Sequence, residues 1–80
     1  MHDVMLFGEG WDGEVRQVEQ GLKRFQFIPN PLETHLREAE FTLIEFFAED
    51  GEVYLVGYSD REPRTPQVEE AILKNLPTPI

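Results

Sequence analysis

Two apolar segments joined by an Asp-Gly pair at residues 50–51 constrain the fold of this chain more than any other feature. Residues 41–48 and 52–58 are rich in aromatic and branched side chains, and an Asp-Gly pair between such segments is a strong signal for a tight turn. We therefore predict an antiparallel hairpin with a two-residue loop, in which Glu49 faces Glu52. In that register one face is wholly apolar and should lie in the core, because it carries Ile44, Phe46, Ala48, Val53 and Leu55.

Shorter segments predict the rest of the secondary structure. Residues 3–7, 14–19 and 22–28 have the composition of strands, and glycines separate them. Such short connections suit an antiparallel meander. Residues 67–76 predict a helix after the candidate N-cap Thr65, with an apolar stripe formed by Val68, Ala71, Ile72 and Leu76.

Residues 31–39 leave two interpretations open. Asn30 as N-cap and Pro31 at the first helical position predict a short helix, and an extended linker is the alternative. The predicted fold class is therefore α+β, with an antiparallel sheet of about five strands, a C-terminal helix and, in the first interpretation, one short middle helix. A chain of 80 residues has room for a single domain, which we place over 1–80.

The charge balance excludes several classes of protein. The chain has 16 acidic and 7 basic residues, which gives a formal charge of −9, so it should not bind nucleic acid directly. It has no Cys, and no apolar run approaches the roughly 20 residues of a membrane span. No basic segment precedes an apolar run, so we expect no signal peptide, no membrane association and a cytoplasmic protein, in the host cytoplasm if a phage encodes it.

No pattern in the sequence predicts catalysis, a metal site or a cofactor. Neither His2 nor His35 lies near a nucleophile motif, and Ser59 is the single serine. The acids around the 50–51 turn lack the spacing of a calcium loop, and the glycines at 8–13 lack the lysine of a phosphate loop. We therefore expect a protein that is not an enzyme and binds no cofactor.

The second face of the predicted hairpin mixes aromatic side chains with carboxylates. Between Arg37 and Arg61 the chain has seven carboxylates and no base. One interpretation is that the C-terminal helix covers this face, and the other is that it stays open to a partner with a basic and apolar groove. Trp11, in a polar turn, either covers the edge of the sheet or anchors a partner. The candidate contacts are Trp11, Glu45, Glu49, Glu52, Tyr54, Tyr58 and Asp60.

The segment over residues 4–15 resembles the opening of a loose group of small uncharacterised phage and bacterial proteins. These begin with a strand, a Gly-Gly-x-x-Asp-Gly turn and a second strand, and Glu9 stands here in place of the second glycine. Residues 49–54 resemble their later hairpin more loosely. The resemblance implies a small β-rich fold and a phage genome, and it implies no activity.

These observations predict a small acidic protein-interaction module. It would bind a basic host or partner protein and inhibit it by occupying a nucleic-acid site, with carboxylates where phosphates would lie. The alternative is a structural or assembly subunit that forms a homodimer or larger assembly through the sheet face, without an inhibitory role.

Overall fold

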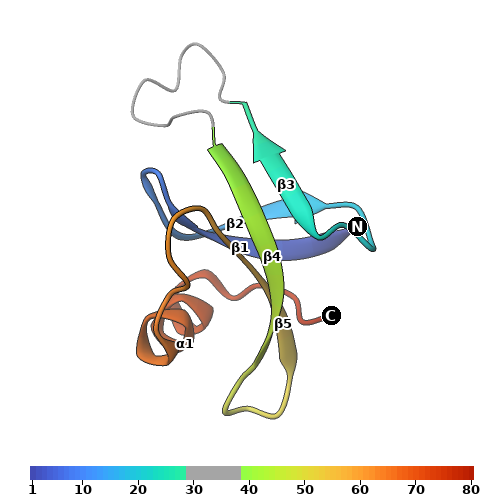
Figure 1. Ribbon diagram of the computed structural model, residues 1–80. Coiled ribbons are helices and arrows are strands. Elements are labelled where there is room, and N and C mark those ends of the chain that lie inside the picture. Colours follow the sequence, from blue (N-terminus) through green and yellow to red (C-terminus); the bar gives the residue numbers. More distant parts are fainter. Residues whose placement is uncertain (29–38) are drawn as a thin grey trace.

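A computed structural model describes residues 1–28 and 39–80 of the chain (Figure 1). Five strands precede one helix in the order β1 (His2–Gly8), β2 (Trp11–Val18), β3 (Arg24–Phe27), β4 (Ala39–Phe47), β5 (Val53–Tyr58) and α1 (Thr65–Asn75). The predicted middle helix lies outside the described residues except for Ala39, which begins β4. The α+β class, with one sheet and a C-terminal helix, is confirmed.

The sheet is mixed, so the prediction of a purely antiparallel sheet is wrong. Its strand order is β2-β1-β5-β4-β3, and β1 runs parallel to β5 while the other neighbours are antiparallel. The predicted meander would have placed β1 at an edge. However, Val4, Met5, Leu6 and Phe7 are all buried, alternately in the two apolar clusters on either side of the sheet, and such a strand is typical of the centre of a sheet. The turn at 19–23 accordingly carries β3 away from β2 to pair with β4.

The β4–β5 hairpin differs from the prediction by one residue. Phe47 pairs with Val53, and the N–H of Ala48 donates to the carbonyl of Glu52 at 3.0 Å, which leaves a three-residue loop instead of two. Gly51 supplies the positive φ of 85° that this loop requires. A shift of one residue moves a whole strand to the other face, so Tyr54, and not Leu55, lies opposite Phe46.

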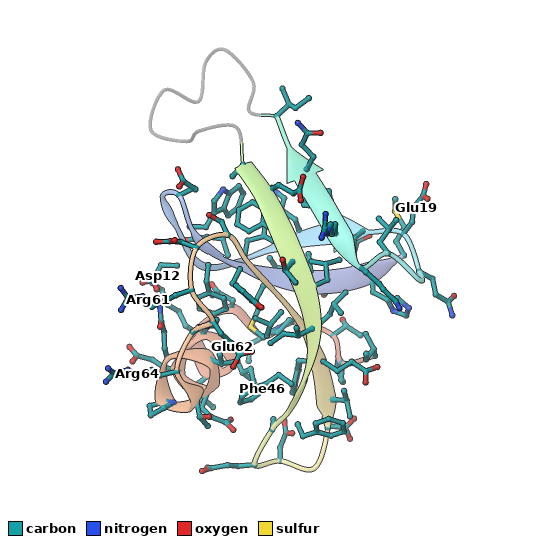
Figure 2. All side chains as sticks on the ribbon, in the orientation of Figure 1. Asp12, Glu19, Phe46, Arg61, Glu62 and Arg64 are labelled. Atoms are coloured by element: carbon teal, nitrogen blue, oxygen red, sulfur yellow. The ribbon has the colours of Figure 1, made fainter. Side chains whose placement is uncertain are left out.

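The helix covers one face of the sheet. Val68, Ala71 and Ile72 of α1 pack against a cluster of sheet residues that comprises Met5, Phe7, Tyr54 and Val56. Phe46 points toward the helix from β4 (Figure 2). The covered face therefore includes Tyr54 and Tyr58 of β5, which the sequence predicted on the mixed face, where either the helix or a partner was expected.

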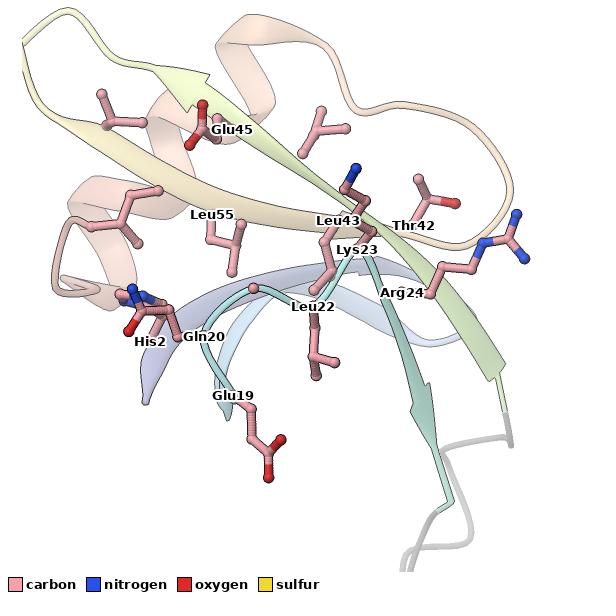
Figure 3. Close-up of a pocket in the computed structure, with 14 residues that line it drawn as sticks. His2, Glu19, Gln20, Leu22, Lys23, Arg24, Thr42, Leu43, Glu45 and Leu55 are labelled. Atoms are coloured by element: carbon pink, nitrogen blue, oxygen red, sulfur yellow. The ribbon is translucent and has the colours of Figure 1, made fainter.

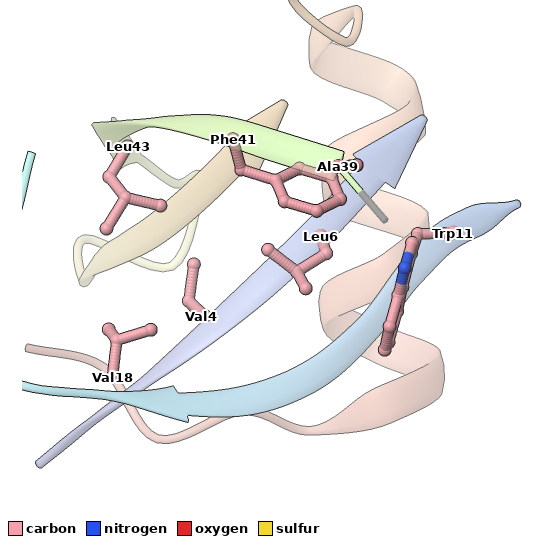
Figure 4. Packing of buried hydrophobic residues seen from close by; sticks show 7 residues of the cluster. All are labelled: Val4, Leu6, Trp11, Val18, Ala39, Phe41 and Leu43. Carbon is pink, nitrogen blue, oxygen red and sulfur yellow. The ribbon is translucent and has the colours of Figure 1, made fainter. Parts of the chain in front are cut away.

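The sheet curls, so side chains on the face away from α1 pack against one another. Figure 4 shows side chains of β1, β2 and β4 converging there, in a cluster formed by Val4, Leu6, Trp11, Val18, Ala39, Phe41 and Leu43. Gly57 permits this close packing, since a Cβ there would lie 2.8 Å from Leu6 and 2.9 Å from Leu43. The sheet thus has an apolar cluster on each side.

Both ends of α1 differ slightly from the prediction. Arg64, and not Thr65, is the N-cap, and Pro66 lies in the first turn, where its missing N–H leaves no bond unmade. The helix ends at Asn75 because Leu76 adopts a left-handed conformation with φ of 49°. This conformation takes Leu76 out of the predicted stripe, and its side chain is 78% exposed.

Two contacts tie α1 and the residues after it to the sheet. Gly13 of β2 lies so close to the helix that a Cβ there would be 2.6 Å from the Cβ of Ala71. Beyond the helix, the Thr78 N–H donates to Asp3 at 2.9 Å and the Ile80 N–H donates to the carbonyl of Val53 at 2.8 Å. The segment after α1 therefore lies along β5, next to the β4–β5 turn.

Candidate partner-binding surface

The structure separates the predicted contact residues into two groups. Glu45 is exposed on the face away from α1, and Glu49 and Glu52 are exposed in the turn. Tyr54 lies on the helix face and is only 6% exposed. Tyr58 is half-buried at the end of β5, and the exposed Asp60 follows it. Four residues separate Tyr58 from Tyr54, which is about 13 Å along a strand. The predicted set therefore does not form one continuous surface.

Trp11 lies in the apolar cluster on the face away from the helix. Its side chain is 5% exposed within this cluster (Figure 4), and the guanidinium of Arg16 lies 4.6 Å from the centre of its ring. This arrangement corresponds to the interpretation in which Trp11 covers the sheet. The ring offers little surface to a partner, so Trp11 is left out of the surface defined below.

Tyr54 and Asp50 fix the shape of the turn. The Tyr54 hydroxyl donates to Oδ2 of Asp50 at 2.7 Å, while Oδ1 accepts the Glu52 N–H at 2.8 Å. The hydrogen bond to Asp50 raises the pKa of Tyr54 to about 12, and the Tyr54 hydroxyl, followed by the Glu52 amide, lowers the pKa of Asp50. The role of Tyr54 in the structure is therefore to hold the turn that presents Glu49 and Glu52.

Phe47 is an exposed aromatic side chain beside the turn that was not among the predicted contact residues. It is 74% exposed, at the end of β4, next to the turn. Because Phe46 and Phe47 are consecutive in a strand, they point to opposite faces, and the helix covers only the face of Phe46. The sequence predicts this alternation, but it does not predict which face of the sheet α1 leaves uncovered. Phe47 and the nearby Glu45, Glu49 and Glu52 define what we call the hairpin surface.

None of the carboxylates of the hairpin surface forms an ion pair with another described residue. Glu69 of α1 adds a further carboxylate there, since its Oε2 accepts the Glu49 N–H at 2.9 Å. Within residues 1–28 and 39–80 one ion pair occurs, between Arg24 and Glu40 at 3.4 Å, and it lies away from the turn. Arg61 and Arg64 project away from the turn on the helix side (Figure 2). The hairpin surface therefore combines an exposed aromatic ring with carboxylates.

A groove of about 890 Å³ lies beside this surface, on the face away from α1 (Figure 3). Leu43 and Leu55 contribute apolar side chains from the sheet, and Leu22 contributes one from the turn between β2 and β3. Glu45 lies at its border and belongs to both the groove and the hairpin surface. The groove was not predicted, because it depends on the turn at 19–23 crossing to β4.

The residues considered for catalysis are scattered. His2 lines the groove, Ser59 packs near Gly8 at the end of β1, and His35 lies outside the described residues. In the described part of the chain no three His, Asp or Glu side chains are grouped in a way that could hold a metal ion. These positions give no support to an active site, and the expectation of a protein without catalytic activity stays a prediction.

No helix among the described residues is long and apolar enough to cross a membrane. The chain matches no protein-family model, and no curated protein or solved structure has significant similarity to it.

Proposed function

We propose that this protein is an interaction module that binds a basic partner protein through the hairpin surface. The observation that carries the proposal is the exposure of Phe47 near carboxylates that form no ion pair among the described residues. An aromatic side chain surrounded by polar residues is typical of the energetic centre of an interface. Carboxylates at its border attract a basic partner and disfavour an acidic one.

The finer part of the proposal is that the partner handles nucleic acid and is inhibited when its binding site is occupied. Basic grooves with apolar walls are typical of such proteins, and the carboxylates of Glu45, Glu49 and Glu52 would take the place of phosphates. A phage origin and a cytoplasmic site of action belong to the same proposal. They rest on the N-terminal resemblance and on the acidic composition.

The proposal can be tested by affinity capture from a bacterial lysate at low and high salt, with mass spectrometry of the bound proteins. Three tagged chains are compared: wild type, the triple variant E45K/E49K/E52K, and the control E9K/E62K/E70K. The control changes the net charge equally at exposed positions away from the hairpin surface. We expect wild type and control to retain a basic protein that salt releases, because screening acts within about 10 Å at 0.1 M salt.

Equal capture by all three chains would contradict the proposal. Absence of any captured protein, together with a solution mass above that of a monomer, would instead favour the self-associating structural subunit.

A further inference from the structure

The outer edge of β4 is open beyond the point where β3 begins. β3 pairs with β4 from Ala39 to Thr42, and the last main-chain bond on this edge joins the Leu43 N–H to the Lys23 carbonyl at 2.9 Å. Figure 1 shows β3 beside only the first part of β4. From Ile44 to Phe47, no main chain among residues 1–28 and 39–80 pairs with this edge.

The main-chain groups of this open edge point outward in a known pattern. In a strand, the N–H and C=O of one residue point to the same side, and this side alternates along the chain. Leu43 directs its N–H toward β3, so Glu45 and Phe47 direct theirs to the same side, away from β5. The edge therefore offers two N–H donors and two C=O acceptors to another chain.

The side chains beside the edge define what an added strand would meet. Glu45 and Phe47 share the face that borders the groove, so they would form cross-strand pairs with alternate residues of the added strand, whereas Lys23 already lies opposite Leu43. A cation fits opposite Glu45, and an apolar side chain fits opposite Phe47. The residues between them would point to the other face.

A second copy of this chain is a poor occupant of the edge. Two β4 strands paired antiparallel over the open residues would place Glu45 opposite Phe47 of the copy and diagonal to the copy's Glu45, so the two carboxylates would repel each other. The hairpin surface adds Glu49 and Glu52 close to the same contact. A basic chain would experience attraction from the same groups.

We propose that an extended segment of the basic partner pairs antiparallel with the open edge of β4 as an added strand, with the pattern apolar-x-basic. This inference rests on the proposed function and specifies how the partner binds. The apolar residue would contact Phe47, and the basic residue would pair with Glu45.

The test uses the peptide Thr-Val-Thr-Lys-Thr, which matches the open edge in the antiparallel direction and is capped at both ends. It is titrated into the isotope-labelled full chain and followed by NMR. A peptide with Glu in place of Lys is the charge control. We expect binding of the first peptide and at least tenfold weaker binding of the second. We also expect slower hydrogen exchange of the Glu45 and Phe47 amides in the complex.

Two substitutions at one position separate the main chain from the charge. Glu45→Gln removes the carboxylate and keeps the N–H, whereas Glu45→Pro removes both. The proline is compatible with the β4–β5 ladder because this N–H points outward. We expect Glu45→Pro to bind the Lys peptide at least fivefold more weakly than Glu45→Gln, with similar far-ultraviolet circular dichroism for both.

The inference is overturned if wild type does not bind the Lys peptide, if the two Glu45 variants bind it equally, or if the two amides gain no protection. The amide measurement decides the question on wild type if Glu45→Pro does not fold. The proposed function can survive such a result. The proposed function would stand if Glu45→Pro and Glu45→Gln both capture a basic protein that E45K/E49K/E52K does not capture. The proposed function would fail as well if E45K/E49K/E52K also captures that protein.

Discussion

The hydroxyl of Tyr54 donates a 2.7 Å hydrogen bond to the carboxylate of Asp50, which joins the second strand of the hairpin to its own turn. This bond connects the core on the helix side with the loop that presents Glu49 and Glu52. The geometry of the hairpin surface therefore depends on the protonation states of two groups that are not in the surface itself.

The first prediction concerns the pH dependence of this bond. The pKa of Tyr54 is raised to about 12 in the folded state, so its contribution to stability is present below the unfolded value of 10 and disappears as the pH rises through 12. The lowered pKa of Asp50 has the opposite dependence. Its contribution is present above the unfolded value of 3.8 and disappears as the pH falls through the folded pKa.

The measurement is thermal unfolding of wild type and Tyr54→Phe across both pH ranges. The melting temperature of wild type should exceed that of the variant at neutral pH, and the difference should shrink at both extremes. Tyr58→Phe is the control, because no hydrogen bond of the Tyr58 hydroxyl is found among the described residues. A Tyr54→Phe difference that is constant with pH would contradict the prediction.

The second prediction concerns Gly13, where the helix meets β2. Its φ is 95°, and an added Cβ would lie 2.6 Å from the Cβ of Ala71, so Gly13→Ala introduces both backbone strain and a steric clash. We expect a loss of about 2–4 kcal/mol in the free energy of unfolding. Urea denaturation measures this loss.

Gly21→Ala is a matched control for the backbone strain. Gly21 also has a positive φ, of 87°, but no atom lies within 4 Å of an added Cβ. We expect this variant to lose only about 1 kcal/mol. Equal losses for the two glycines would show that the contact with Ala71 contributes nothing.

The third prediction separates binding from stability at Phe47. Phe47→Ser removes an exposed ring, so the free energy of unfolding should change by less than about 0.5 kcal/mol. Loss of a central aromatic contact typically costs about 2 kcal/mol or more of binding free energy, so affinity for the captured partner should fall at least tenfold. Calorimetric titration measures the affinity.

Leu73→Ser is the matched control for Phe47→Ser, because Leu73 is 79% exposed on α1 and belongs to a different surface. It should leave binding unchanged. If both variants weaken binding equally, the partner contacts exposed apolar groups without preference for the hairpin surface.

The fourth prediction concerns the segment that follows α1. The Thr78 amide is the main cause of the lowered pKa of Asp3, and a side-chain bond from Gln17 at 2.6 Å also contributes. Asp3→Asn removes the charge that accepts the Thr78 N–H, so the Thr78 amide should exchange its hydrogen faster than in wild type. The Val56 amide, in the buried centre of the sheet, is the internal reference, and its rate should not change if the effect is local.

The sequence predicted those elements whose formation depends on residues close together in the chain. The Asp-Gly pair and the aromatic segments beside it predicted the hairpin, and the stripe of Val68, Ala71 and Ile72 predicted the helix surface that is buried. Both signals depend on residues close together in the chain. They do not depend on which elements become neighbours.

The errors arose where distant segments meet. Asp-Gly pairs occur in both two-residue and three-residue loops, so the pair alone does not determine the loop length. The two-residue loop was the wrong choice, and it placed Tyr54 on the wrong face of the hairpin. The central position of β1, whose side chains enter the apolar clusters on both faces, was not predicted, because it depends on pairing with β5. Glu45, Glu49 and Glu52 were identified from charge, whereas Phe47 and the groove required knowledge of what α1 leaves uncovered.

The parallel pairing of β1 with β5 also determines the order in which this protein can fold. Val4 and Leu55 are 51 positions apart in the chain, yet they are partners in the centre of the sheet. The two hairpins close short loops and can form early, while the central pair must close a long loop with a larger entropic cost. We expect refolding to be limited by this last pairing. Its rate should therefore be more sensitive to substitutions in β1 and β5 than to substitutions in the turns.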